Sequence, residues 1–142
     1  MKKIFLLVFF TVTILFCKAQ FLQSLDTVKA PAMYENIYIK KIYSDSLASS
    51  FVIFIKKEVQ AHKHIIHTEH VYILEGEAEM TTSGINTSYA NKKFTVKKGD
   101  IIFIPKGTVH SLKVSLQTPL KVLSVQSPMF DGKDRVIAEE KK

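Results

Sequence analysis

Short β-type segments, separated by turn residues at close intervals, restrict this chain to all-β architectures. Apolar residues alternate over 37–39 and 51–55, and β-branched or aromatic residues are frequent over 70–74, 101–104 and 120–125. Turn-forming residues separate these runs at 44–46, 75–76, 83–84, 98–100 and 105–107. Many short strands with a turn about every 8–12 residues predict a sandwich or a barrel.

Helical signals are weak by comparison. No stretch of about ten residues or more has the periodicity of an amphipathic helix. Pro31 disfavours a helix through the residues around it, and residues 134–140 could form a turn or two of helix. We therefore expect an all-β fold.

The first nineteen residues have the layout of a secretory signal peptide. Two lysines precede an uncharged, mostly apolar run over 4–16, which is shorter than the about 20 residues that span a membrane. We expect cleavage after Ala19 and export to the periplasm or outside the cell, with no membrane attachment afterwards. The alternative is lipidation at Cys17, which the bulky Phe16 disfavours because processing sites prefer small side chains.

The remaining length suits one domain with a single core. We expect an N-terminal arm over 20–34, a β-barrel over 35–130 and a C-terminal tail over 131–142. Cys17 is the only cysteine, so the mature chain has neither a disulfide framework nor a thiolate metal site.

The net charge gives no reason to expect a nucleic-acid partner. Loss of residues 1–19 removes three lysines and lowers the formal charge from +7 to +4. The other lysines are scattered in pairs and form no basic stripe with interleaved aromatic residues, which a nucleic-acid surface would need.

Four of the five histidines fall between positions 62 and 70. His62 and His64 project to one face if they lie on a strand, because side chains alternate with a period of two. Glu69 could add a carboxylate after a short turn, and His110 would come from a distant strand. Three imidazoles and a carboxylate bind a divalent metal and leave coordination positions open. The alternative is a set of exposed strand histidines that binds metal only adventitiously.

The spacing around these residues resembles the two sequence motifs of the cupin family. The motifs read His62-x-His64-x4-Glu69-x6-Gly76 and Gly99-x5-Pro105-x-Gly107-x2-His110, with 22 residues between them. The resemblance covers about residues 56–114. This chain has Lys56 where the family usually has glycine and Val114 where it usually has asparagine, and neither position is a metal ligand in the family.

The resemblance implies a cupin double-stranded β-helix, which is a jelly-roll barrel, in a single domain. It also implies one divalent metal ion bound by His62, His64, Glu69 and His110, and a homodimer. Period two then predicts that the pocket is lined by Val71, Ile73, Leu112 and Val114. Glycines 76, 99 and 107 are expected at tight reversals with positive φ.

Two other histidines are harder to place. His67 falls in the turn between ligands, and His70 should point away from the pocket if Glu69 points in. We expect both to face solvent. A role in acid–base chemistry is the alternative, for which His67 near the barrel mouth is the better candidate, and Glu69 could double as a proton acceptor.

The metal and the reaction are left open by the sequence. Because export in an unfolded state implies metal uptake outside the cytoplasm, we expect Zn, Mn or Fe. The resemblance implies a metal-dependent enzyme of the dioxygenase, decarboxylase, isomerase or lyase type, which we expect to act on a small organic acid, sugar acid or phenol. The alternatives are a non-catalytic small-molecule-binding cupin and a sugar epimerase type, for which the four ligands would be unnecessary.

Overall fold

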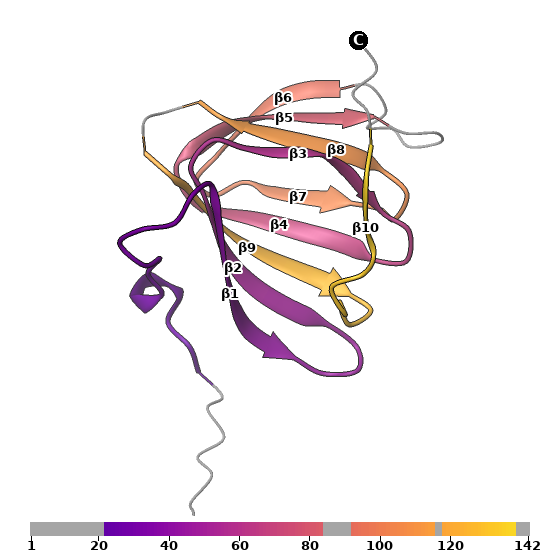
Figure 1. The fold of residues 1–142 in the computed structure, drawn as a ribbon, viewed down its shortest axis with the longest axis horizontal. Coiled ribbons are helices and arrows are strands. Elements are labelled where there is room, and N and C mark those ends of the chain that lie inside the picture. The colour runs from indigo at the N-terminus through magenta and orange to yellow at the C-terminus, as the bar shows by residue number, and fades with distance from the viewer. Residues whose placement is uncertain (1–21, 84–91, 116–117, 139–142) are drawn as a thin grey trace, which may run out of the picture.

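The computed structural model describes residues 22–83, 92–115 and 118–138, which form two five-stranded antiparallel sheets (Figure 1). The first sheet has the strand order β1-β2-β9-β4-β7 and the second β10-β3-β8-β5-β6. Their bounds are β1 Ile37–Ser44, β2 Ser49–Ile55, β3 Glu58–His64, β4 Thr68–Glu75, β5 Glu77–Ser83, β6 Lys92–Lys97, β7 Ile101–Ile104, β8 Val109–Val114, β9 Leu120–Ser127 and β10 Arg135–Ile137. The prediction of an all-β fold is confirmed: these ranges hold no α-helix, and the only helical element among them is a 3-10 turn, η1 (Leu25–Thr27).

The main core lies between the two sheets, where alternate side chains of each strand point inward. In β5, for example, Ala78, Met80 and Thr82 are buried while their neighbours are partly exposed. The buried apolar residues of this core come from both sheets: Ile55, Ile73, Ala78, Met80, Val96, Ile102, Ile104, Leu112, Leu120 and Val122. None of the described segments forms a helix long and apolar enough to cross a membrane.

The arm before β1 covers the outer face of the first sheet. Val28 packs with Val52 and Phe54, which alternate with the inward-facing residues of β2. The buried ammonium of Lys121 also donates a hydrogen bond of 2.9 Å to the carbonyl oxygen of Leu25. The predicted signal peptide at 1–19, with Cys17, lies outside the described residues.

The turn between β4 and β5 requires glycine for two reasons. Gly76 has φ of +88°, which L-residues with a side chain rarely adopt. A Cβ atom at this position would also lie 3.1 Å from the Cα atom of Leu120. Positive φ angles at Gly99 and Gly107 were predicted as well, and they are confirmed.

A β-bulge in β3 aims the histidines inward. Val59 pairs with Leu112 and His62 with His110, so the register of β3 on β8 shifts between these two pairs. Three positions separate Val59 from His62, and without the extra residue their side chains would point to opposite faces. The bulge lets both face the interior, since both line one cavity.

The C-terminal segment, residues 129–138, contains the strand β10, whereas the sequence analysis allowed a turn or two of helix over 134–140. β10 pairs with the outer edge of β3, with Arg135 opposite His64 and Ile137 opposite His62. Figure 1 shows this segment running beside the ends of β4 and β9 before it joins β3. It therefore lies next to the strand that carries two of the predicted ligands.

Candidate metal centre

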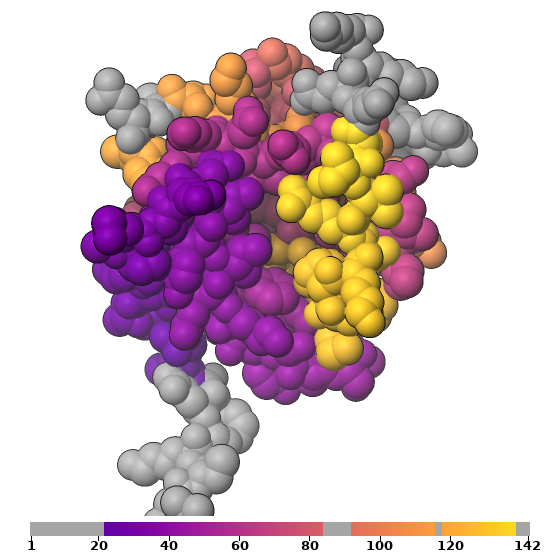
Figure 2. All heavy atoms as spheres, viewed as in Figure 1, coloured from indigo at the N-terminus to yellow at the C-terminus, as the bar shows by residue number. Residues whose placement is uncertain are grey.

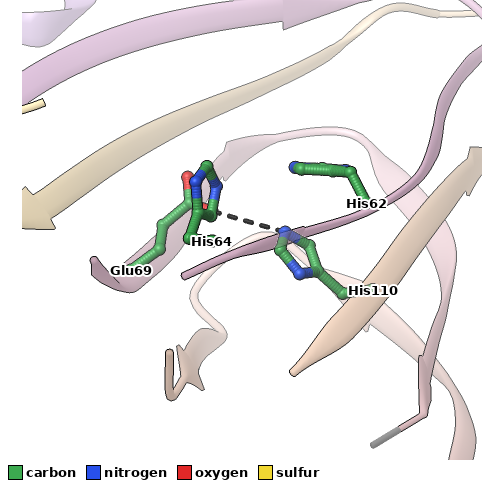
Figure 3. Close-up of side chains that lie close together, drawn as sticks. All are labelled: His62, His64, Glu69 and His110. Atoms are coloured by element: carbon green, nitrogen blue, oxygen red, sulfur yellow. Dashed lines mark ion pairs between the residues drawn. The ribbon is translucent and has the colours of Figure 1, made fainter. Parts of the chain in front are cut away.

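The four predicted metal ligands lie together in the barrel interior (Figure 3). His62 and His64 come from β3, Glu69 from the start of β4, and His110 from β8, where it pairs with His62. Each of the four offers one ligand atom, and these atoms all lie within 4.8 Å of one another. All four residues are buried.

Backbone carbonyls fix the orientation of two of the imidazoles. Nδ1 of His62 lies 2.8 Å from the carbonyl oxygen of Gln60, and Nδ1 of His110 lies 3.1 Å from that of Thr108. Because a carbonyl only accepts, each Nδ1 donates, and in the neutral imidazole Nε2 is then the nitrogen with a lone pair for a metal. Burial, and then repulsion from His110, lowers the pKa of His62 to about 3, so this imidazole is neutral and ready to bind a cation.

The two carboxylate oxygens of Glu69 have different neighbours: Oε2 faces the other metal ligands, and Oε1 faces β9. Oε2 lies 3.6 Å from Nε2 of His64 and 3.5 Å from Nε2 of His110. These distances are long for hydrogen bonds, whereas ligands held at about 2.1 Å from one ion stand about 3.0–3.4 Å apart at angles of about 90–109°. The spacing therefore suits atoms that share an ion.

The other oxygen of Glu69 is held by neighbours on β9. Ser124 donates a hydrogen bond of 2.5 Å to Oε1, and Gln126 donates a second of 3.3 Å. Burial alone would raise the pKa of Glu69, but polar contacts with His110 and His64 and the Ser124 hydroxyl hold it well below its usual value. The carboxylate is thus ionised and oriented. Sequence reasoning missed Ser124 and Gln126, although Gln126 is the cross-strand neighbour of Glu69.

A cavity of about 140 Å³ lies beside the four ligands. Figure 2 shows the surface hollowed between the N-terminal strands and the C-terminal segment, and both contribute to the cavity wall. The side chains that line it are mostly apolar: Ile37, Ile39, Ile53, Ile55, Val59, Val71, Met80, Ile104, Leu112, Val122 and Phe130, with Ser111, Gln126, Arg135 and the ligands themselves.

Two of the four residues predicted to line the pocket do so. Val71 and Leu112 line the cavity, while Ile73 is fully buried in the core and Val114 packs against that core. Ile73 and Val114 lie two positions further along their strands, about 7 Å from Val71 and Leu112. At these positions the space between the two sheets is filled by side chains of the main core, so the cavity does not extend to them.

His67 is buried, and the expectation that it faces solvent is wrong; only 3% of its surface is exposed. Its Nδ1 pairs with the carboxylate of Asp134, and its Nε2 donates a hydrogen bond of 2.9 Å to the carbonyl oxygen of Met129. Burial lowers the pKa of His67, but these two acceptors outweigh it and raise the pKa overall. His70 does face solvent, where it packs edge-on against Phe103.

Asp134 joins the C-terminal segment to the turn between β3 and β4. Besides pairing with His67, its carboxylate accepts hydrogen bonds of 2.9–3.1 Å from the backbone N–H groups of Ile65, Ile66 and His67. These bonds hold the pKa of Asp134 well below its usual value despite burial. Sequence reasoning missed this residue, because no spacing signal links it to partners 67–69 positions away.

Phe130, also in the C-terminal segment, packs between His67 and the metal ligand His64. Its ring packs edge-on against the rings of His64, at 5.8 Å, and His67, at 5.3 Å. The Nδ1 atom of His64 lies 4.0 Å from Oδ2 of Asp134. The C-terminal segment therefore packs directly behind a ligand rather than extending away from the barrel.

The donor set fits a divalent transition metal. Imidazole nitrogens and one carboxylate oxygen are ligands that Zn, Mn and Fe accept. Two of the imidazoles have Nδ1 engaged by a carbonyl, an arrangement that orients histidine ligands in metalloproteins. The residues present therefore fit a single metal ion.

Comparison with known proteins assigns the fold to a family. The family model described as the cupin domain matches residues 51–126. An uncharacterized protein of Methanocaldococcus jannaschii is 36% identical over 107 residues, which cover 75% of this chain and 78% of that protein. A solved structure of a conserved protein with a double-stranded β-helix domain, from Klebsiella pneumoniae, superposes with a TM-score of 0.68 at 22% identity, covering 85% of this chain and 99% of its own.

An enzyme also shares part of this sequence. A mannose-1-phosphate guanylyltransferase of Klebsiella pneumoniae is 35% identical over 79 residues, which cover 56% of this chain but 15% of that protein. The double-stranded β-helix expected from the two motifs is confirmed by the solved structure, whose whole length matches. This chain belongs to the cupin family.

Proposed function

We propose that this cupin is a metal-dependent enzyme that acts on a small oxygen-bearing organic molecule. The observation that supports the proposal is the position of the four ligand side chains at the wall of a mostly apolar cavity. A bound divalent ion would supply Lewis-acid polarisation of a substrate oxygen. Zn, Mn and Fe are the metals we propose, and they match the donor set.

The chain's own residues would orient the substrate and exclude water. The apolar side chains of β1 and β2, such as Ile39 and Ile53, would cover the carbon skeleton of the substrate. Phe130 would close the side next to His64. Glu69 is held by Ser124, so its role is to bind the ion through Oε2 rather than to carry protons.

The first experiment measures metal content after purification without a histidine tag. We expect about one equivalent of a single divalent metal, and loss of that metal in His64→Ala. His70→Ala is the matched control, because it removes an exposed histidine from the outer face of β4. Elemental analysis of the three proteins, with circular dichroism to check folding, decides the question. A wild-type protein that neither carries metal nor takes it up when metals are added contradicts the proposal.

A ligand-binding cupin without turnover is the second candidate, and one observation favours it. Among the described residues that line the cavity, the titratable side chains are the four ligands and Arg135. His67, the other candidate for acid–base chemistry, has both ring nitrogens engaged and does not line the cavity. Incubation of metal-loaded protein with a bound ligand, followed by mass spectrometry, separates the two: an altered ligand supports the enzyme and an unaltered one the binding module.

We also propose that the protein is exported and works outside the cytoplasm. The apolar run over 4–16 and the small residue Ala19 support a cleaved signal peptide. The test is the intact mass of the protein recovered from the periplasm, which identifies its first residue. We expect the mass of a chain that begins at Gln20. A lipidated chain that begins at Cys17 and is found in the membrane fraction would contradict cleavage after Ala19.

A further inference from the structure

Arg135 is the only cationic side chain among the described residues that line the cavity. It lies in β10 directly opposite His64, and paired residues of antiparallel strands point to the same face. Its side chain therefore projects on the side where His64 projects. Arg135 is exposed at the mouth of the cavity, and no hydrogen bond or ion pair links its guanidinium to another described residue.

The guanidinium lies close enough to the metal ligands to sense their charge. The Glu69 carboxylate opposes the effect of burial, which lowers the pKa of Arg135. The positive charge of Arg135 also contributes to lowering the pKa of His62, after burial and His110. Arg135 and the four ligands line the same cavity, and Arg135 pairs with His64 across the strands, so one small molecule in the cavity can reach both.

The charges around the cavity leave a positive excess once a divalent ion is bound. Ligating imidazoles are neutral, so Glu69 supplies the one negative charge among the four ligands. Asp134 is already paired with His67 and three backbone N–H groups. The ion and Arg135 then face the same apolar cavity without a counter-charge from the described residues.

We propose, resting on the metal site of the proposed function, that this cavity binds small organic carboxylates, with the carboxylate on Arg135 and a neighbouring oxygen toward the metal. A single planar guanidinium matches a carboxylate in two parallel hydrogen bonds. A phosphate would call for more cationic donors, and Arg135 is the only one among the described residues that line the cavity. The apolar walls then select a short aliphatic body.

The test uses Co²⁺-loaded protein, whose visible absorption reports on ligands at the metal. The probes are 2-hydroxy-4-methylpentanoate and its amide, which have the same body and hydroxyl group but differ in charge. We expect Arg135→Gln to weaken binding of the carboxylate about tenfold or more and binding of the amide less than about twofold. Lys133→Gln removes an exposed positive charge two residues away and should change neither.

The outcomes separate this inference from the proposed function. Equal weakening of both probes, or no weakening of the carboxylate, overturns the role of Arg135 while leaving the metal centre intact. Equal Arg135-dependence for inorganic phosphate overturns the carboxylate assignment. A wild-type protein that takes up no Co²⁺ overturns the metal centre, and the inference with it. Metal content of each variant, measured first, shows whether Arg135→Gln keeps the site.

Discussion

The metal ligands and the C-terminal segment border the same cavity, but they are held in different ways. His62, His64, Glu69 and His110 belong to strands of six to eight residues with partners in the sheets. The C-terminal segment contributes a strand of three residues, paired on one edge only. One carboxylate, that of Asp134, bonds this segment to the turn after β3, and Met129 and Phe130 add one hydrogen bond each.

The orientation of Glu69 rests on two hydrogen-bond donors, whereas the turn after β3 rests on one carboxylate. The carboxylate of Glu69 keeps Gln126 as a second donor if Ser124 is lost. The turn after β3 has no comparable substitute, because one carboxylate accepts the N–H groups of Ile65, Ile66 and His67. Substitutions should therefore affect the C-terminal attachment more than the ligand support.

The largest effect is expected from Asp134→Ala. Loss of a buried carboxylate leaves three backbone N–H groups and the ring of His67 without their acceptor, which should lower the free energy of unfolding by about 3 kcal/mol. Urea denaturation measures the change. Asp131→Ala is the control, because Asp131 is exposed and accepts one local backbone bond from Lys133. Equal stability of the two variants would show that the segment is held by other contacts.

Substitution of one glycine in the barrel and one in the C-terminal segment compares the cost of a side chain in the two regions. Gly76 and Gly132 both have positive φ, but a Cβ atom at Gly76 meets the backbone of Leu120, whereas one at Gly132 meets nothing within 4 Å. Gly76→Ala should lower the free energy of unfolding by about 2 kcal/mol and Gly132→Ala by about 1 kcal/mol. Thermal denaturation of both variants gives the order. A larger loss for Gly132→Ala would contradict the view that packing at Leu120 adds to the strain.

The strands and the metal ligands could be predicted from the sequence, because local residue patterns and motif spacing mark them. Alternation located β1 and β2, β-branched and aromatic residues located β4, β7 and β9, and the motif spacing selected the four residues that the structure brings together. The bulge in β3 did not disturb this prediction, because it precedes His62 and leaves His62 and His64 two positions apart. Local periodicity was enough for these features.

The rest depended on contacts that no local pattern records. A strand of three residues, such as β10, is too short to show a period of two. Asp134 and His67 are 67 positions apart, and either alone is an ordinary surface residue type. The burial of His67 follows only from the position of the C-terminal segment, which the sequence set apart as a tail.

The smallest effect is expected from Ser124→Ala, which tests the redundancy at Glu69. Loss of the 2.5 Å hydrogen bond leaves Oε1 with Gln126 at 3.3 Å, so Glu69 stays ionised but is less firmly oriented. Residues that orient metal ligands contribute about 10–100-fold to affinity, and a remaining donor places this variant near tenfold. Competition with a chelator measures the affinity, with Ser127→Ala as control, because that hydroxyl bonds only to the exposed loop at Leu47. Unchanged affinity would mean that Gln126 alone orients Glu69. A hundredfold loss would show that the orientation of Glu69, like the turn after β3, depends on one side chain.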